Sequence, residues 1–108
     1  MMKRILLVVA LLTFSFSSID FAKEKGKLVI IGGVQVTSIM KKFVELAGGP
    51  NAKIIIIPNA GSDPVENSLI QVEEFKELGA YSDYLMFTRE TADADSNLKK
   101  LDEATAVF

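Results

Sequence analysis

The chain has 108 residues, with 12 Lys and Arg against 14 Asp and Glu, no cysteine, no histidine and a formal net charge of -2. The absence of cysteine excludes disulfides, thiolate catalysis and cysteine-based zinc sites, and the absence of histidine removes the commonest general base and metal ligand. A mildly acidic chain without a basic cluster also gives no support for nucleic-acid binding, which depends on clustered Lys and Arg that neutralise phosphates.

Residues 1–22 have the layout of a secretory signal peptide. A basic start, MMKR, precedes the apolar run ILLVVALLTFSF, and small and polar residues follow as far as Ala22. The run is shorter than the roughly 20 residues that a membrane-spanning helix needs, so we expect cleavage and no stable membrane anchor. Cleavage after Ala22 places Asp20 where a small residue is preferred, so a cut near Ser17 or Ser18 stays open. We therefore expect residues 23–108 to form a secreted or periplasmic protein.

The first half of the remaining chain reads as strand, helix, strand. Residues 28–31, LVII, predict a fully buried strand because four apolar, mostly branched residues are contiguous. Apolar side chains recur at helical spacing from Ile39 to Ala47, with Thr37 or Ser38 as the expected cap and Gly-Gly-Pro at 48–50 as the end. Residues 53–57, KIIII, predict a second strand, which Pro58 ends because proline lacks a ladder donor.

The second half continues the alternation. A helix is expected from about Pro64 to Gly79, with an apolar side made of Leu69, Val72, Phe75 and Leu78. Residues 84–87, YLMF, predict a third strand, and residues 97–104 predict a helix that Asp93, Asp95 or Ser96 opens. Residues 105–108, TAVF, begin a fourth strand.

This alternation of strands and helices indicates an α/β protein with a parallel sheet covered on both faces. With right-handed crossovers it predicts a Rossmann-like or flavodoxin-like three-layer sandwich. Because the sequence ends as its fourth strand begins, we expect it to be the N-terminal part of a longer domain.

The double glycine at Gly32 and Gly33 lies between the first strand and the first helix. Helix N-terminal amides and glycine's close backbone approach both favour anions, so this context suits a phosphate site. The dinucleotide pattern G-x-G-x-x-G is not met, because Val34 and Gln35 stand where its next glycine belongs, and no G-x-x-x-x-G-K-[ST] occurs. A plain tight turn is favoured, and nucleotide binding is the weaker alternative.

The loop NAGSDP at residues 59–64 follows the second strand, at the sheet edge where ligands bind in open α/β proteins. Ser62 invites comparison with a catalytic nucleophile. The G-x-S-x-G elbow is absent, however, and no histidine is present to activate the hydroxyl. The sequence therefore favours a turn or a helix cap at this loop.

Four segments together carry a family resemblance: KGKLVIIGG, IMKKFVELAGGPNAKIIIIPNAGSDP, EEFKELGA and EATAVF. They resemble the opening half of the cyanophycinase and dipeptidase E family of serine peptidases, whose fold is shared with class I glutamine amidotransferases. The similarity covers nearly all of residues 26–108. It implies a hydrolase that cleaves peptide or isoaspartyl bonds with a serine on a nucleophile elbow, assisted by a histidine and an acid, without a cofactor.

The resemblance transfers no catalytic residue onto this chain, since the family's triad falls after the segments that match. It implies that the chain supplies part of the wall of a substrate pocket, formed by Gly32, Gly33, Asn59, Ala60 and Ser62. Val34 departs from the family, which usually has a third glycine there, and a β-branched residue disfavours positive φ. A noncatalytic periplasmic binding module on a flavodoxin-like scaffold is the alternative.

Overall fold

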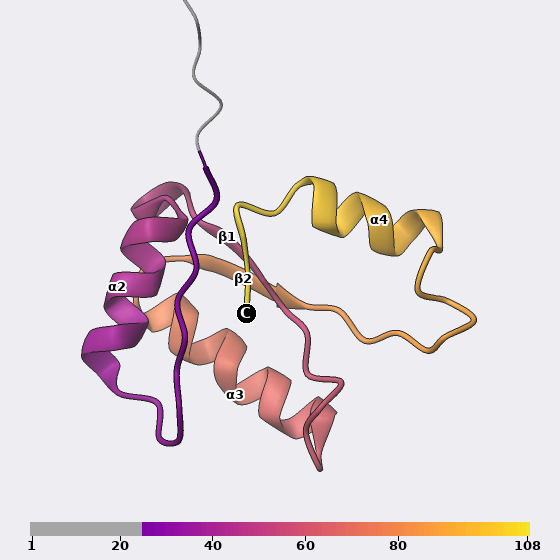
Figure 1. Cartoon of the computed structure of the whole chain (residues 1–108), viewed down its shortest axis with the longest axis horizontal. Helices are drawn as coiled ribbons and strands as arrows, with labels where there is room; N and C mark the ends of the chain where they lie inside the picture. Colours follow the sequence, from indigo (N-terminus) through magenta and orange to yellow (C-terminus); the bar gives the residue numbers. More distant parts are fainter. Residues whose placement is uncertain (1–24) are drawn as a thin grey trace, which may run out of the picture.

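The structure, a computed structural model, describes residues 25–108, so the predicted signal peptide at 1–22 lies outside the described residues. Helices and strands alternate along this part of the chain (Figure 1). In order they are α2 (Thr37–Ala47), the short 3-10 helix η2 (Gly49–Asn51), β1 (Lys53–Ile56), α3 (Pro64–Glu77), β2 (Tyr81–Tyr84), α4 (Asp95–Asp102) and β3 (Ala106–Val107).

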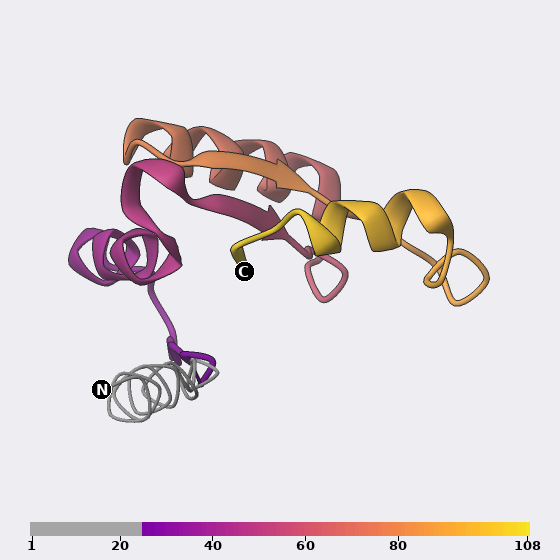
Figure 2. The same cartoon turned by 90° about the horizontal axis from the view of Figure 1, so that it is seen from above.

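The three strands found in residues 25–108 form one parallel sheet in the order β2-β1-β3. Lys53 of β1 is level with Tyr81 of β2, and Ile54 is level with Ala106 of β3. Helices α2 and α3 lie on one side of the sheet and α4 on the other (Figure 1, and from above in Figure 2). The predicted α/β class with a parallel sheet is confirmed, and the arrangement is compatible with part of a Rossmann-like or flavodoxin-like sandwich.

The main core lies between the sheet and the pair α2 and α3. Ile54 and Ile56 of β1 face this core, as alternation along a strand requires, and Ile55 is buried outside it. Phe75 of α3 is fully buried at the centre, with its ring centroid 5.8 Å from that of Phe43 and 5.1 Å from that of Phe108. The aromatic contacts therefore join α2, α3 and the end of β3.

Helix α2 has the predicted range but not the predicted cap. Its N-cap is Val36, and no side chain makes a cap hydrogen bond. Thr37 already has helical geometry, so neither it nor Ser38 stands in the flanking position from which a hydroxyl accepts from the first turn. The predicted end is confirmed, because the helix stops at Gly48.

Helix α3 begins as expected, with Pro64 in its first turn and Asp63 as the N-cap, whose side chain accepts from the Glu66 backbone N–H at 3.3 Å. Its buried row is Ser68, Val72 and Phe75. These positions are spaced i, i+4 and i+7, whereas Leu69 lies one position further round the helix and is 53% exposed. The prediction for Leu69 was wrong, and those for Val72 and Phe75 are confirmed.

Strand β2 lies three residues before the predicted strand at 84–87. Its polar members have partners: the Ser82 hydroxyl donates to the Val72 carbonyl at 2.8 Å, and Asp83 pairs with Lys100 of α4 at 2.8 Å. Leu85 follows the strand, is buried, and donates its N–H to the Ile56 carbonyl at 2.9 Å. Most of the apolar run YLMF therefore lies after the end of the strand.

The prediction of a buried strand at residues 28–31 was wrong. These residues pair with no strand of the described chain, and Leu28 and Ile30 are 82% and 84% exposed. The edge of β1 opposite β2 is held by β3, which leaves this segment beside the sheet without a ladder partner.

The last predicted elements are found with shifted starts. Helix α4 begins two residues earlier than expected, at Asp95, and its N-cap is Ala94 without a side-chain cap bond. Asp95 is one of the three residues predicted to open this helix, so that prediction is confirmed, although its side chain makes no cap bond. The expected final strand is confirmed as β3.

Asp83 provides a pH-dependent link between β2 and α4. Burial raises the pKa of its carboxyl, but hydrogen bonds from Lys100 and from the Tyr84 backbone, with the Lys100 charge, lower that pKa below its ordinary value of 3.8. A depressed folded-state pKa contributes stability above the unfolded value, and that contribution is lost as pH falls through the folded pKa.

We expect Asp83→Asn to lower the free energy of unfolding at pH 7 by less than about 1 kcal/mol, since Asp83 and Lys100 are both partly exposed. The gap between variant and parent should shrink as the pH is lowered below 3.8, measured by urea unfolding at several pH values. Glu45→Gln is the control, because it removes a more exposed ion pair with Lys42. A gap that widens in acid would contradict the assignment.

Candidate functional site

The loop at residues 59–63 follows the carboxyl end of β1 and is a tight turn, as predicted. The Gly61 N–H donates to the Pro58 carbonyl at 2.9 Å. A Cβ at Gly61 would lie 3.4 Å from the Pro58 oxygen and 3.6 Å from Asn67 Nδ2, so a small residue fits best. The capping residue of α3 is Asp63, and Ser62 stays in the turn.

Asn59 ties this loop to the one that follows β2. Its side-chain Nδ2 donates to the Phe87 carbonyl at 2.7 Å. Since β1 and β2 are parallel neighbours, their carboxyl ends meet at one edge, and this bond holds the two exits together. The sequence reading identified Asn59 but not Phe87, because a backbone acceptor leaves no signal in the residue type.

Among residues 25–108, no neighbouring base contacts the Ser62 hydroxyl to activate it as a nucleophile. Its side chain is exposed, and among residues 25–108 no hydrogen bond to its hydroxyl is found. The neighbouring carboxylate of Asp63 is already used as the α3 cap. A serine nucleophile needs an adjacent base, so the described residues give Ser62 and the exposed Ala60 at most a place in a pocket wall.

The bend that leads toward α2 lies at Gly33 and Val34, and Gly32 directly precedes it. Gly33 has φ of +83°, a conformation that glycine adopts freely, and a Cβ on either glycine would meet nothing within 4 Å. Gly33 lines a pocket of about 310 Å³ together with Phe43 and Phe108. Asn59, Ala60 and Ser62 do not line that pocket, so a shared rim for all the predicted wall residues stays a prediction.

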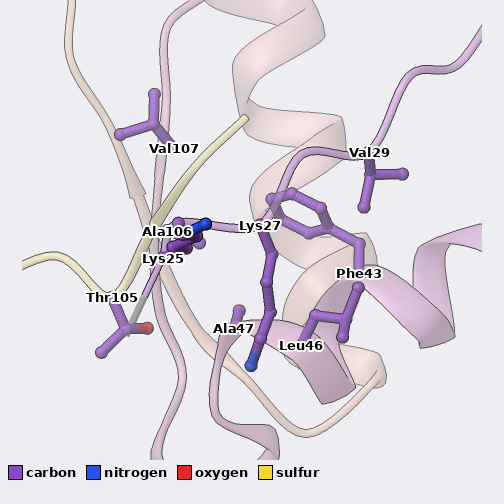
Figure 3. Close-up of a pocket in the computed structure, with 10 residues that line it drawn as sticks. Lys25, Lys27, Val29, Phe43, Leu46, Ala47, Thr105, Ala106 and Val107 are labelled. Atoms are coloured by element: carbon purple, nitrogen blue, oxygen red, sulfur yellow. The ribbon is translucent and has the colours of Figure 1, made fainter. Parts of the chain in front are cut away.

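A second pocket, of about 330 Å³, lies away from these loops (Figure 3). Phe43, Leu46 and Ala47 of α2 line one side, and Thr105, Ala106 and Val107 line the other. Lys25, Lys27 and Val29 complete it. Its lining residues include no carboxylate and no paired acid and base, so they provide no group that would activate a nucleophile.

No cluster of three or more His, Cys, Asp or Glu in residues 25–108 is placed to hold a metal ion. Within the same residues, no helix has the length and apolar character needed to cross a membrane.

No family model, no curated protein and no solved structure matches this chain. The structure itself defines the class as an α/β protein with a parallel sheet. The loops after β1 and β2 lie at the carboxyl edge of this sheet and are joined by the hydrogen bond from Asn59.

Proposed function

We propose that this chain is part of an exported serine-type peptidase of the cyanophycinase and dipeptidase E kind, and that it forms one wall of the pocket for a peptide or isoaspartyl substrate. The observation that carries the proposal is the hydrogen bond from Asn59 to the Phe87 carbonyl. It fixes two neighbouring loops at the carboxyl edge of a parallel sheet, which is where α/β enzymes bind their ligands. The resemblance of the segments around this edge supports the same assignment.

In the proposed chemistry, this chain binds the substrate and the rest of the domain supplies the catalytic residues. Acyl transfer needs a nucleophile, a base and oxyanion donors held together. The 108 residues contain no histidine, so in the proposal the nucleophile elbow, its histidine and its acid belong to a further part of the same domain. The loop at 59–63 would bind and orient the substrate and take no part in bond breaking, and no cofactor would be needed.

The test uses the chain extended by whatever coding sequence follows Phe108. We expect the extended protein to react with an active-site-directed fluorophosphonate and to hydrolyse an isoaspartyl dipeptide, and the 108-residue chain to do neither. Asn59→Ala in the extended protein should raise KM by about fivefold with kcat kept, since one hydrogen bond contributes about 1 kcal/mol.

Asn51→Ala is the matched control, because Asn51 is exposed and precedes β1, at the opposite end of that strand from the loop. It should leave KM unchanged. The proposal fails if no coding sequence continues the chain, or if the extended protein is neither labelled nor active.

A noncatalytic peptide-binding module is the second candidate. It is favoured by the exposed Ser62, which has no base beside it, and by the absence of histidine and cysteine from the whole sequence. An extended protein that binds the dipeptide in calorimetry, yet neither reacts with the phosphonate nor hydrolyses the peptide, would identify this class.

A further inference from the structure

Strand β2 forms one edge of the sheet, since β1 is its only strand neighbour in residues 25–108. Successive residues of a strand direct their backbone N–H and C=O groups to opposite sides. The N–H groups of Tyr81 and Leu85 donate to carbonyls of the segment 52–56, at 3.1 and 2.9 Å. Ser82 and Tyr84 alternate with these two residues, so their backbone groups point away from the sheet.

Both outward backbone groups of Tyr84 are covered by the side chains of Asp83 and Lys100, here called the edge pair. The Tyr84 N–H donates to Asp83 Oδ1 at 2.8 Å, and the Tyr84 carbonyl accepts from Lys100 Nζ at 3.2 Å. The two side chains also contact each other, with 2.8 Å between Lys100 Nζ and Asp83 Oδ2. One ion pair therefore satisfies both a donor and an acceptor of the open edge.

The edge pair stands in the way of any further strand at β2. An open edge can pair with a strand of another chain, because its outward N–H and C=O groups lack partners, and charged side chains on edge strands are one device that prevents this. A strand that bonded to Tyr84 would have to displace both the Asp83 carboxylate and the Lys100 ammonium. The edge is therefore closed at Tyr84 by contacts within the chain.

Without the edge pair, this edge is suited to a second copy of the chain. Two copies related by a two-fold axis place one β2 antiparallel to the other. Each copy then offers two donors and two acceptors at Ser82 and Tyr84, so the two edges have matching numbers of hydrogen-bonding groups. Tyr81 is on the same strand and is 60% exposed, so it would add apolar contact between the copies.

We propose that the edge pair is an autoinhibitory contact, which keeps β2 from pairing with the β2 of a second copy. Opening it requires rotation of two side chains and no change in the backbone of the sheet. The side chains are 44% exposed at Lys100 and 35% exposed at Asp83, and exposed ion pairs are weak, so the pair can open while the chain stays folded. The inference does not depend on the proposed function, because it uses no residue of the proposed pocket wall.

The test removes the edge pair from the full 108-residue chain by combining Asp83→Ala with Lys100→Ala. The protein concentration at half-association, measured by sedimentation equilibrium, should fall by at least about tenfold relative to the parent chain, because each of the two copies loses its own edge pair. The Ser82 amide, which faces the same edge, should become protected from hydrogen exchange as the concentration rises. This second readout places the contact between copies at β2.

Lys42→Ala combined with Glu45→Ala is the matched control. It also removes one ion pair with 2.8 Å between nitrogen and oxygen and leaves the net charge unchanged, but both residues belong to α2. This variant should associate at the same concentration as the parent chain. The proposal is overturned if the two double variants associate equally, or if association of the edge-pair variant leaves the Ser82 amide unprotected.

Hydrogen exchange of the unsubstituted chain gives a result that does not depend on the variants folding. The Tyr84 amide, which donates to Asp83, should exchange about tenfold more slowly than the Ser82 amide of the same edge, after correction for the sequence dependence of exchange. Equal corrected rates would show that the carboxylate does not hold this edge closed, and would overturn the proposal.

Discussion

Replacing Phe75 with alanine is expected to lower the free energy of unfolding by about 3–5 kcal/mol, the range for removal of a buried aromatic side chain. Phe75 is 0% exposed and sits between α2, the sheet and the end of β3. Its ring lies 5.1 Å from Phe108 in an edge-on arrangement and 5.8 Å from Phe43, measured between centroids. Alanine would remove both aromatic contacts and leave a cavity where two helices and the sheet meet.

The measurement is urea unfolding of the full chain followed by circular dichroism. Leu69→Ala is the matched control, since Leu69 is on the same helix and is 53% exposed. It should change the free energy of unfolding by no more than about 0.5 kcal/mol. Equal losses in the two variants would mean that α3 does not pack through Phe75. If Phe75→Ala shows no cooperative transition, Phe75→Leu, which retains most of the apolar volume, should restore one.

The elements that sequence predicts well here are those whose signals are local. The continuous run of isoleucines defines β1, and Gly-Gly-Pro defines the end of α2. Pro64 marks the start of α3, although the capping side chain is that of Asp63. Each of these features depends on backbone preferences of neighbouring residues, which a short window of sequence contains.

Strand β2 was misplaced because its stability comes from partners distant in sequence. Ser82 and Asp83 look unsuited to a sheet interior, yet Ser82 donates to the Val72 carbonyl and Asp83 pairs with Lys100. A buried polar group costs little once its hydrogen bond is made. No local pattern of residues indicates those bonds, so the sequence placed the strand at the apolar run 84–87.

The candidate site also contains one feature that local sequence predicts and one that it does not. The turn at residues 59–63 follows from its Asn, Gly, Ser and Asp content, which favours tight turns. The bond from Asn59 to the Phe87 carbonyl joins positions 28 residues apart and depends on the register of β1 and β2. The segment at residues 28–31 shows the reverse case: its local sequence predicted a strand, but the edge of β1 opposite β2 is occupied by β3, which no local pattern at 28–31 indicates.

Replacing Gly48 with alanine is expected to lower the free energy of unfolding by about 1–3 kcal/mol, the cost of holding a residue with a side chain in a sparsely populated backbone region. Gly48 ends α2 with φ of +123° and ψ of 6°. A Cβ there would come no closer than 3.5 Å to any neighbour, which is ordinary contact. The loss would therefore be conformational and not steric.

Gly32→Ala isolates that cause. Gly32 has no positive φ and open space around its Cα, so alanine should leave stability unchanged or raise it by up to about 1 kcal/mol by restricting the unfolded chain. Thermal and urea unfolding of both variants would separate the two effects. A Gly48→Ala chain as stable as the Gly32→Ala chain would show that the turn after α2 can re-form with negative φ. Because this turn leads from α2 through η2 into β1, a large loss at Gly48 would show that the chain can enter the central strand only through a positive φ at this residue.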